Sequence, residues 1–144
     1  MVRIIRPDSP ARARTSLVAG IHTALADLDA AANPDALGDR LAYAGLALRE
    51  LQRSTERTAD AWERRGYWLK ADQFRREWGW AGHGAEAILT PLLRDDLPAA
   101  QAAASALLPR LQPAPAASAP KISVKHWTGA LARLKTAPRA VHGP

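Results

Sequence analysis

The stretch LGDRLAYAGLALRELQRSTERTADAWERRGYWLKADQFRREWGWAGHGAEAI, residues 37–88, decides the fold because it holds two successive helical patterns. In both patterns the seam positions are spaced alternately four and three residues apart, which is typical of one buried face along a helix. The first seam comprises Leu37, Leu41, Ala44, Leu48, Leu51, Thr55, Thr58 and Trp62. The second comprises Tyr67, Ala71, Phe74, Trp78, Ala81, Ala85 and Ile88. Gly66 alone separates them as a left-handed helix cap, so the sequence predicts a tightly turned antiparallel hairpin.

Cap and proline signals outside this stretch predict the remaining helices. Ser9-Pro10 and Asn33-Pro34 each place a capping side chain before a proline in the first helical position. The first helix is therefore expected from residue 10, with a stripe that continues to residue 32, and the second over 35–65. Thr90-Pro91 is expected to break the third helix, and Asp95-Asp96 to cap a fourth that Pro109 kinks or shortens. The predicted fold class is an all-α antiparallel bundle over residues 1–111, with three long helices and a shorter fourth.

The C-terminal part of the chain divides at a proline- and alanine-rich segment. Residues 112–120, QPAPAASAP, are typical of a semi-rigid extended linker. Residues 121–144 form a basic tail, and within it Trp127, Leu131 and Leu134 follow helical spacing. A short amphipathic helix of this kind could fill a groove on a partner, lie on an anionic membrane, or pack back on its own bundle. The sequence leaves these three uses open.

Composition excludes several functional classes. The chain has 144 residues and no cysteine, which rules out disulfide scaffolds and thiolate metal sites. Its four histidines include no pair four residues apart, so we expect no metal and no cofactor. No apolar run reaches the ~18–20 residues that span a bilayer, and the opening residues do not resemble a signal peptide. The expected location is the cytoplasm.

The net charge of +6 is unevenly distributed. Residues 97–144 hold six basic and no acidic side chains, whereas the 14 basic and 14 acidic residues of 1–96 cancel. Such an asymmetry attracts nucleic acid, anionic lipid or an acidic protein surface. Removal of residues 112–144 is therefore expected to leave a folded bundle of charge +1 that has lost most of any electrostatic binding.

Basic side chains interleaved with aromatic ones surround the predicted turn, a combination that suits single-stranded nucleic acid. Ion pairs with Glu63, Asp72 and Glu77 on an ordinary solvated surface explain the same pattern equally well. The candidate nucleic-acid-binding residues are Arg64, Arg65, Lys70, Arg75 and Arg76 on the bundle, and Lys121, Lys125, Arg133 and Lys135 on the tail.

A second face of the third helix and the tail stripe are the candidate partner-docking surfaces. Trp80 points away from the seam and shares a face with Leu69, Arg76 and Ala87, where we expect it to pack on the first or fourth helix. The glycines at 79, 82 and 84 are expected to bend this helix or to let another approach closely. The docking residues are Leu69, Trp80, Trp127, Leu131 and Leu134.

These features predict a non-enzymatic accessory or scaffold subunit of a larger assembly that contains nucleic acid, either DNA or RNA. One alternative is a protein–protein adaptor or homo-oligomer that uses the Leu69–Arg76–Trp80 face or the tail stripe. A further alternative is a metal-independent ribonuclease, because Arg76 and His83 lie two helical turns apart and could serve as phosphate binder and general acid or base. The motif is too short to assign a catalytic residue.

Overall fold

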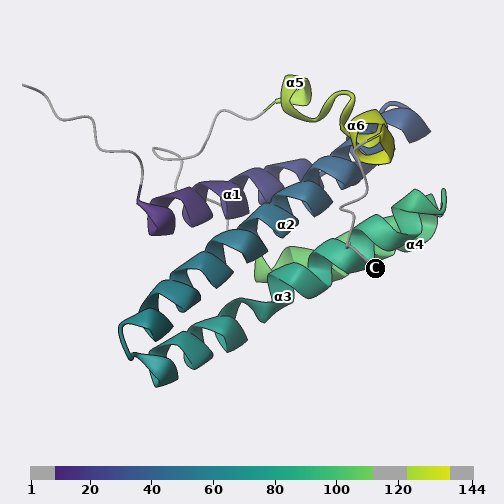
Figure 1. Cartoon of the computed structure of the whole chain (residues 1–144). Coiled ribbons are helices and arrows are strands. Elements are labelled where there is room, and N and C mark those ends of the chain that lie inside the picture. Colours follow the sequence, from purple (N-terminus) through teal and green to yellow (C-terminus); the bar gives the residue numbers. More distant parts are fainter. Residues whose placement is uncertain (1–8, 112–122, 137–144) are drawn as a thin grey trace, which may run out of the picture.

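A computed structural model describes residues 9–111 and 123–136, and this part of the chain is all-α without strands. Figure 1 shows the helices as an antiparallel bundle. Two single 3₁₀ turns, Leu28–Ala30 and Leu108–Arg110, follow the first and the fourth helix. The helices are α1 (Pro10–Leu25), α2 (Pro34–Arg64), α3 (Trp68–Leu93), α4 (Leu97–Leu107), α5 (Val124–Trp127) and α6 (Ala130–Thr136). The predicted linker 112–120, the N-terminal residues 1–8, Lys121 and residues 137–144 lie outside the described residues.

The central hairpin predicted from the two seams is confirmed. Gly66 has φ +84°, the left-handed conformation that glycine adopts without steric cost. The amide of Tyr67 donates to the Trp62 carbonyl at 2.9 Å, which closes the turn. Leu41, Leu48 and Leu51 are fully buried in the core, and α2 packs on α3 along the hairpin.

The predicted helix starts are confirmed by their caps. The Ser9 hydroxyl accepts from the Arg12 amide at 3.2 Å, and the Asn33 side chain accepts from the Ala36 amide at 2.9 Å. The Asp96 carboxylate accepts from the Ala99 amide at 3.2 Å at the start of α4. Each of these caps is followed by a proline in the first turn, which needs no amide hydrogen there.

Two predicted helix ends and one predicted seam position were wrong. Helix α1 ends at Leu25 rather than near residue 32, although Leu28 stays buried in the following 3₁₀ turn. Helix α3 continues through Pro91 to Leu93. Pro91 removes the hydrogen bond to the carbonyl of Ala87, an exposed residue, and the helix ends two residues later. Tyr67, expected in the second seam, is 57% exposed because the hairpin ends there and nothing faces it.

Helix α2 lies at the centre of the molecule and contacts α1, α3, α4, α5 and α6. Its crossing with α3 is close at Gly45, where an added Cβ would lie 2.4 Å from Leu89 Cδ2. Toward the hairpin turn, α1 is attached by the buried Arg14, whose guanidinium donates to Thr58 at 3.0 Å and lies 4.9 Å from the Phe74 ring. Burial lowers the pKa of Arg14. The fully buried side chains that form the core are Ile21, Leu41, Leu48, Leu51, Ile88, Leu89 and Leu92.

The described part of the tail, residues 123–136, packs on α2 at the end of the bundle opposite the hairpin turn (Figure 1). It forms two short helices rather than one, because the chain turns at Gly129 with φ +82°. Asp39 of α2 caps the second of them: its carboxylate oxygens accept from the amides of Gly129 and Leu131, both at 3.0 Å. A carboxylate at a helix N-terminus satisfies free amides and opposes the positive end of the helix dipole.

We therefore expect Asp39→Ala to weaken tail docking by about 0.5–2 kcal/mol, the usual cost of losing a helix cap. Hydrogen exchange of the Gly129 and Leu131 amides measures it, and both are expected to exchange faster. Asp39→Asn keeps one accepting oxygen and should lose less. Unchanged exchange in Asp39→Ala would show that the carboxylate does not hold the tail.

Candidate nucleic-acid interface

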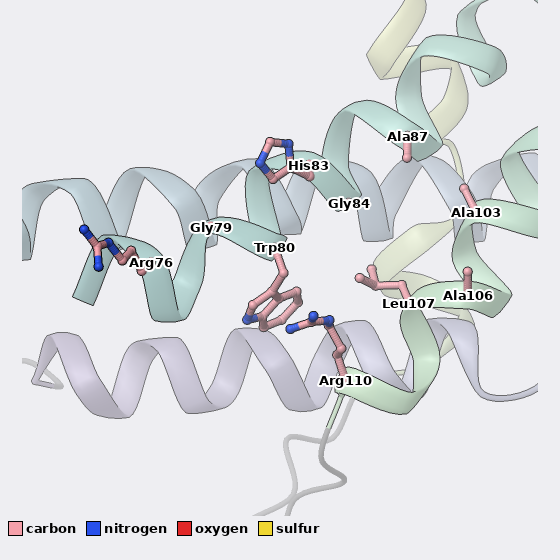
Figure 2. Close-up of a pocket in the computed structure, with 10 residues that line it drawn as sticks. All are labelled: Arg76, Gly79, Trp80, His83, Gly84, Ala87, Ala103, Ala106, Leu107 and Arg110. Carbon is pink, nitrogen blue, oxygen red and sulfur yellow. The ribbon is translucent and has the colours of Figure 1, made fainter. Parts of the chain in front are cut away.

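A groove of about 670 Å³ runs between α3 and the C-terminal end of α4. Figure 2 shows that α3 contributes one wall and that α4 with its 3₁₀ extension contributes the other. The lining residues are Arg76, Gly79, Trp80, His83, Gly84, Ala87, Ala103, Ala106, Leu107 and Arg110.

The antiparallel register of α3 and α4 brings these residues together. Each step forward along α4 is a step back along α3, so the chain reaches Arg110 where α3 has Trp80. In Figure 2 the Arg110 guanidinium points toward the Trp80 indole. Gly84 permits the close approach, since an added Cβ would lie 3.1 Å from Leu107 Cδ1. The remaining wall positions include alanines at 87, 103 and 106, whose side chains are short.

The groove is basic and partly aromatic. Its lining contains two arginines and a histidine and no carboxylate. Trp80 is half-buried and stacks on Trp78 with ring centroids 5.9 Å apart and planes inclined by 28°. Arg76 pairs with Asp72 at 2.9 Å, but its side chain is 78% exposed. An exposed pair of this kind contributes at most about 1 kcal/mol, so a phosphate can replace the Asp72 carboxylate.

The other predicted basic residues of the bundle lie toward the hairpin turn. Arg64, Arg65 and Lys70 are exposed, and the Lys70 ammonium lies 4.5 Å from the Trp62 ring centroid. The structure therefore separates these three from Arg76, which belongs to the groove.

Arg75 was predicted to bind nucleic acid, but its guanidinium is engaged in an ion-pair cluster. Its guanidinium bonds to Glu63, to Glu56 at 3.1 Å and to Asp60 at 2.7 Å. The hydrogen bonds to Glu63 and then Glu56 hold the pKa of Arg75 above its ordinary value. These contacts fasten α3 to α2, so Arg75 is better explained as a structural residue.

The predicted tail stripe is covered by the bundle, which corrects its interpretation as an exposed docking surface. Trp127 and Leu134 are buried, and Leu131 packs over Gly38 of α2. Trp127 lies 6.2 Å from the Tyr43 ring and 4.8 Å from the Arg40 guanidinium. Burial raises the pKa of Tyr43. The apolar stripe is buried on the bundle because α2 provides an apolar surface and Asp39 caps α6.

The basic residues in the described part of the tail are on the surface. Lys125 and Arg133 are exposed, whereas Lys135 pairs with Asp95 at 2.7 Å. The predicted Leu69–Arg76–Trp80 face is divided, since Arg76 and Trp80 line the groove and Leu69 lies near the hairpin turn, 71% exposed. The Arg76–His83 pair stays together on the groove wall, with both side chains exposed.

Comparison with protein-family models, curated proteins and solved structures finds no match to this chain. Among the described residues, no three histidine, aspartate or glutamate side chains are grouped so that they could hold a metal ion. No helix within residues 9–111 or 123–136 is long and apolar enough to cross a membrane.

Arg110 is the groove residue that sequence reasoning missed. In the sequence it contributes only to the charge excess after residue 96. Its position in the groove follows from the antiparallel pairing of α3 and α4, a contact between distant residues that no local pattern displays.

Proposed function

We propose that this chain is a non-enzymatic accessory protein that binds single-stranded nucleic acid in the groove between α3 and α4. The observation that carries the proposal is the lining itself, which combines Arg76, His83 and Arg110 with the Trp80 indole and contains no carboxylate. Arginines bind phosphates in any sequence context, and an indole offers a surface on which an unpaired base can stack.

The shape of the groove favours a single strand over a duplex. Gly84 and three alanines form much of its lining, and Trp80 is half-buried in its wall. A base must leave a duplex to stack there, whereas a single strand presents its bases without that cost. Exposed Lys125 and Arg133 of the tail would add sequence-independent attraction. As an accessory subunit the protein would act within a nucleoprotein assembly, which we place in the cytoplasm.

Titration of the full chain with a fluorescent 20-nucleotide oligothymidylate at 50 and 200 mM salt tests the proposal. We expect a Kd below about 1 μM at the lower salt and weaker binding to the matching duplex. The Arg76→Ala/Arg110→Ala variant should bind more weakly, with a salt dependence shallower by about 1.4 in log–log slope, since each single-strand phosphate contact contributes about 0.7. Trp80→Leu, which keeps an apolar side chain, should weaken binding at both salt concentrations.

Two further variants make this test specific. Arg53→Ala/Arg57→Ala removes the same charge from α2, where both arginines pair with Glu50 outside the groove, and should change affinity much less. Asp72→Asn releases Arg76 from its ion pair and should raise affinity by up to about fivefold. If the groove variant and the α2 variant lost affinity equally, binding would depend on net charge alone. That result would overturn the assignment of the groove.

A further inference from the structure

Three consecutive large side chains are exposed where the hairpin turns. Tyr67, Trp68 and Leu69 are 57%, 66% and 71% exposed. Among the described residues only Leu93, at 48%, joins them as an exposed large hydrophobic side chain. We call residues 64–70 the hairpin tip; it forms one end of the molecule in Figure 1. Contiguous apolar side chains on a surface mark an interaction site more often than scattered ones do.

The exposed side chains are not needed to close the hairpin. Closure is achieved behind them by Gly66, by the Tyr67 amide bond to Trp62, and by Trp62 packing on Phe74 with centroids 4.8 Å apart. Trp68 and Leu69 add little to this packing because most of their surface faces water. Their apolar surface is therefore left for a contact outside the chain.

The tip is also strongly positive. Arg64, Arg65 and Lys70 are exposed, and no acidic residue occurs in the first turn of α3. The flanking carboxylates are already paired, Glu63 with Arg75 and Asp72 with Arg76. Three cations thus surround three apolar side chains at the end of a rigid helical pair.

We propose that the hairpin tip docks on an anionic lipid bilayer. Tyrosine and tryptophan side chains favour the level of the lipid headgroups, where the ring is partly in hydrocarbon and the polar atom meets water. Leu69 inserts beside them, and the three cations meet lipid phosphates and carboxylates. This surface is separate from the groove and uses none of the groove's lining residues.

The composition of the tip favours a bilayer over the other anionic surfaces it could meet. Leu69 is the most exposed of the three apolar residues, and an aliphatic side chain gives no stacking surface to a base. The apolar residues and the cations lie together at the end of a hairpin, so a flat interface can meet all of them at once. With only three apolar residues, docking is reversible and depends on the anionic lipid.

Co-sedimentation of the full chain with vesicles tests the proposal. We expect binding to vesicles of 70% phosphatidylcholine and 30% phosphatidylserine and at least tenfold weaker binding to pure phosphatidylcholine. Arg64→Gln/Arg65→Gln should lower the partition coefficient by about 30-fold, because each surface cation contributes about 1 kcal/mol. The variant Trp68→Ser/Leu69→Ser should also lose vesicle binding. Because both residues are exposed, the fold should be unaffected.

Matched variants separate the tip from net charge and from the groove. Two control variants remove arginines or an exposed leucine outside the hairpin tip: Arg53→Gln/Arg57→Gln and Leu93→Ser. Both should bind vesicles much as the unmodified chain does. The groove variant Arg76→Ala/Arg110→Ala should retain vesicle binding, and the tip variants should retain most oligothymidylate binding, so either proposal can fail alone.

Three results would overturn the bilayer as the occupant. Equal partition onto both kinds of vesicle, or no partition onto either, would show that the tip does not recognise an anionic bilayer. Loss of oligothymidylate binding in Trp68→Ser/Leu69→Ser would assign the tip to nucleic acid. A dimer in light scattering at high salt that disappears in the same variant would make a second copy of the chain the occupant.

Discussion

Leu89→Ala is expected to lower the free energy of unfolding by about 2–5 kcal/mol, which is among the largest effects that a single substitution can have in this protein. Leu89 is fully buried and packs on Gly45, at a close approach of α2 and α3. Alanine leaves a cavity that the two helices cannot close, because the flanking core residues Leu41, Leu48 and Ile88 hold their separation. Urea unfolding followed by circular dichroism measures the loss.

The contact also predicts a compensating pair. Gly45→Ala gains about 1 kcal/mol of helix propensity but places a Cβ 2.4 Å from Leu89 Cδ2, and overpacking of this kind costs about 1–3 kcal/mol. In the double variant the new methyl group occupies part of the cavity, so the combined loss should be smaller than the sum. Leu93→Ala, on the same helix but 48% exposed, is the control and should cost less than about 1 kcal/mol. Strict additivity would contradict the close approach.

Trp127→Ala is expected to detach the tail from α2. The indole is buried between the Tyr43 ring and the Arg40 guanidinium, and truncation of a buried tryptophan costs about 3–5 kcal/mol. The loss is limited to the free energy of tail docking, since residues 9–111 hold most of the core. We expect α5 and α6 amides to lose protection from hydrogen exchange while those of α2 and α3 near Leu48 keep it.

His126→Ala gives the control for this prediction, because His126 is the exposed neighbour of Trp127 on the same short helix. It should leave exchange in α6 nearly unchanged. If Trp127→Ala also left it unchanged, the remaining contacts of the tail, such as Asp39, Leu131, Leu134 and the Lys135–Asp95 ion pair, would be sufficient to hold it. If protection disappeared in α2 and α3 as well, tail and bundle would unfold as a single unit.

Local signals predicted the bundle well. The spacing of Leu37 to Trp62, the glycine at 66 and the cap-proline pairs at Ser9 and Asn33 all act within a few residues, so the sequence displays them directly. The end of α3 is less directly displayed: the helix continues two residues past Pro91, and the cost of a proline depends on the surroundings of the carbonyl one turn earlier.

The site depended on contacts between distant residues. Asp39 caps a helix that begins about 90 positions later, and Arg110 meets Trp80 through the register of two helices. In neither pair does the sequence around one residue indicate which residue it will contact. Charge runs were similarly ambiguous: Arg75 and Arg76 are neighbours, but one faces three carboxylates of α2 and the other lines the groove.

The docking of the tail on α2 also bears on the order in which the chain is completed during synthesis. Asp39 and Leu131 are separated by 92 residues, so α2 leaves the ribosome long before its last partner exists. At about 5–20 residues per second this interval lasts about 5–20 s, far longer than helix formation or the pairing of α2 with α3. The nascent bundle therefore leaves Gly38, Asp39 and Tyr43 without their tail partners until α6 has been synthesised. We expect a chain truncated after Leu111 to keep this part of α2 uncovered.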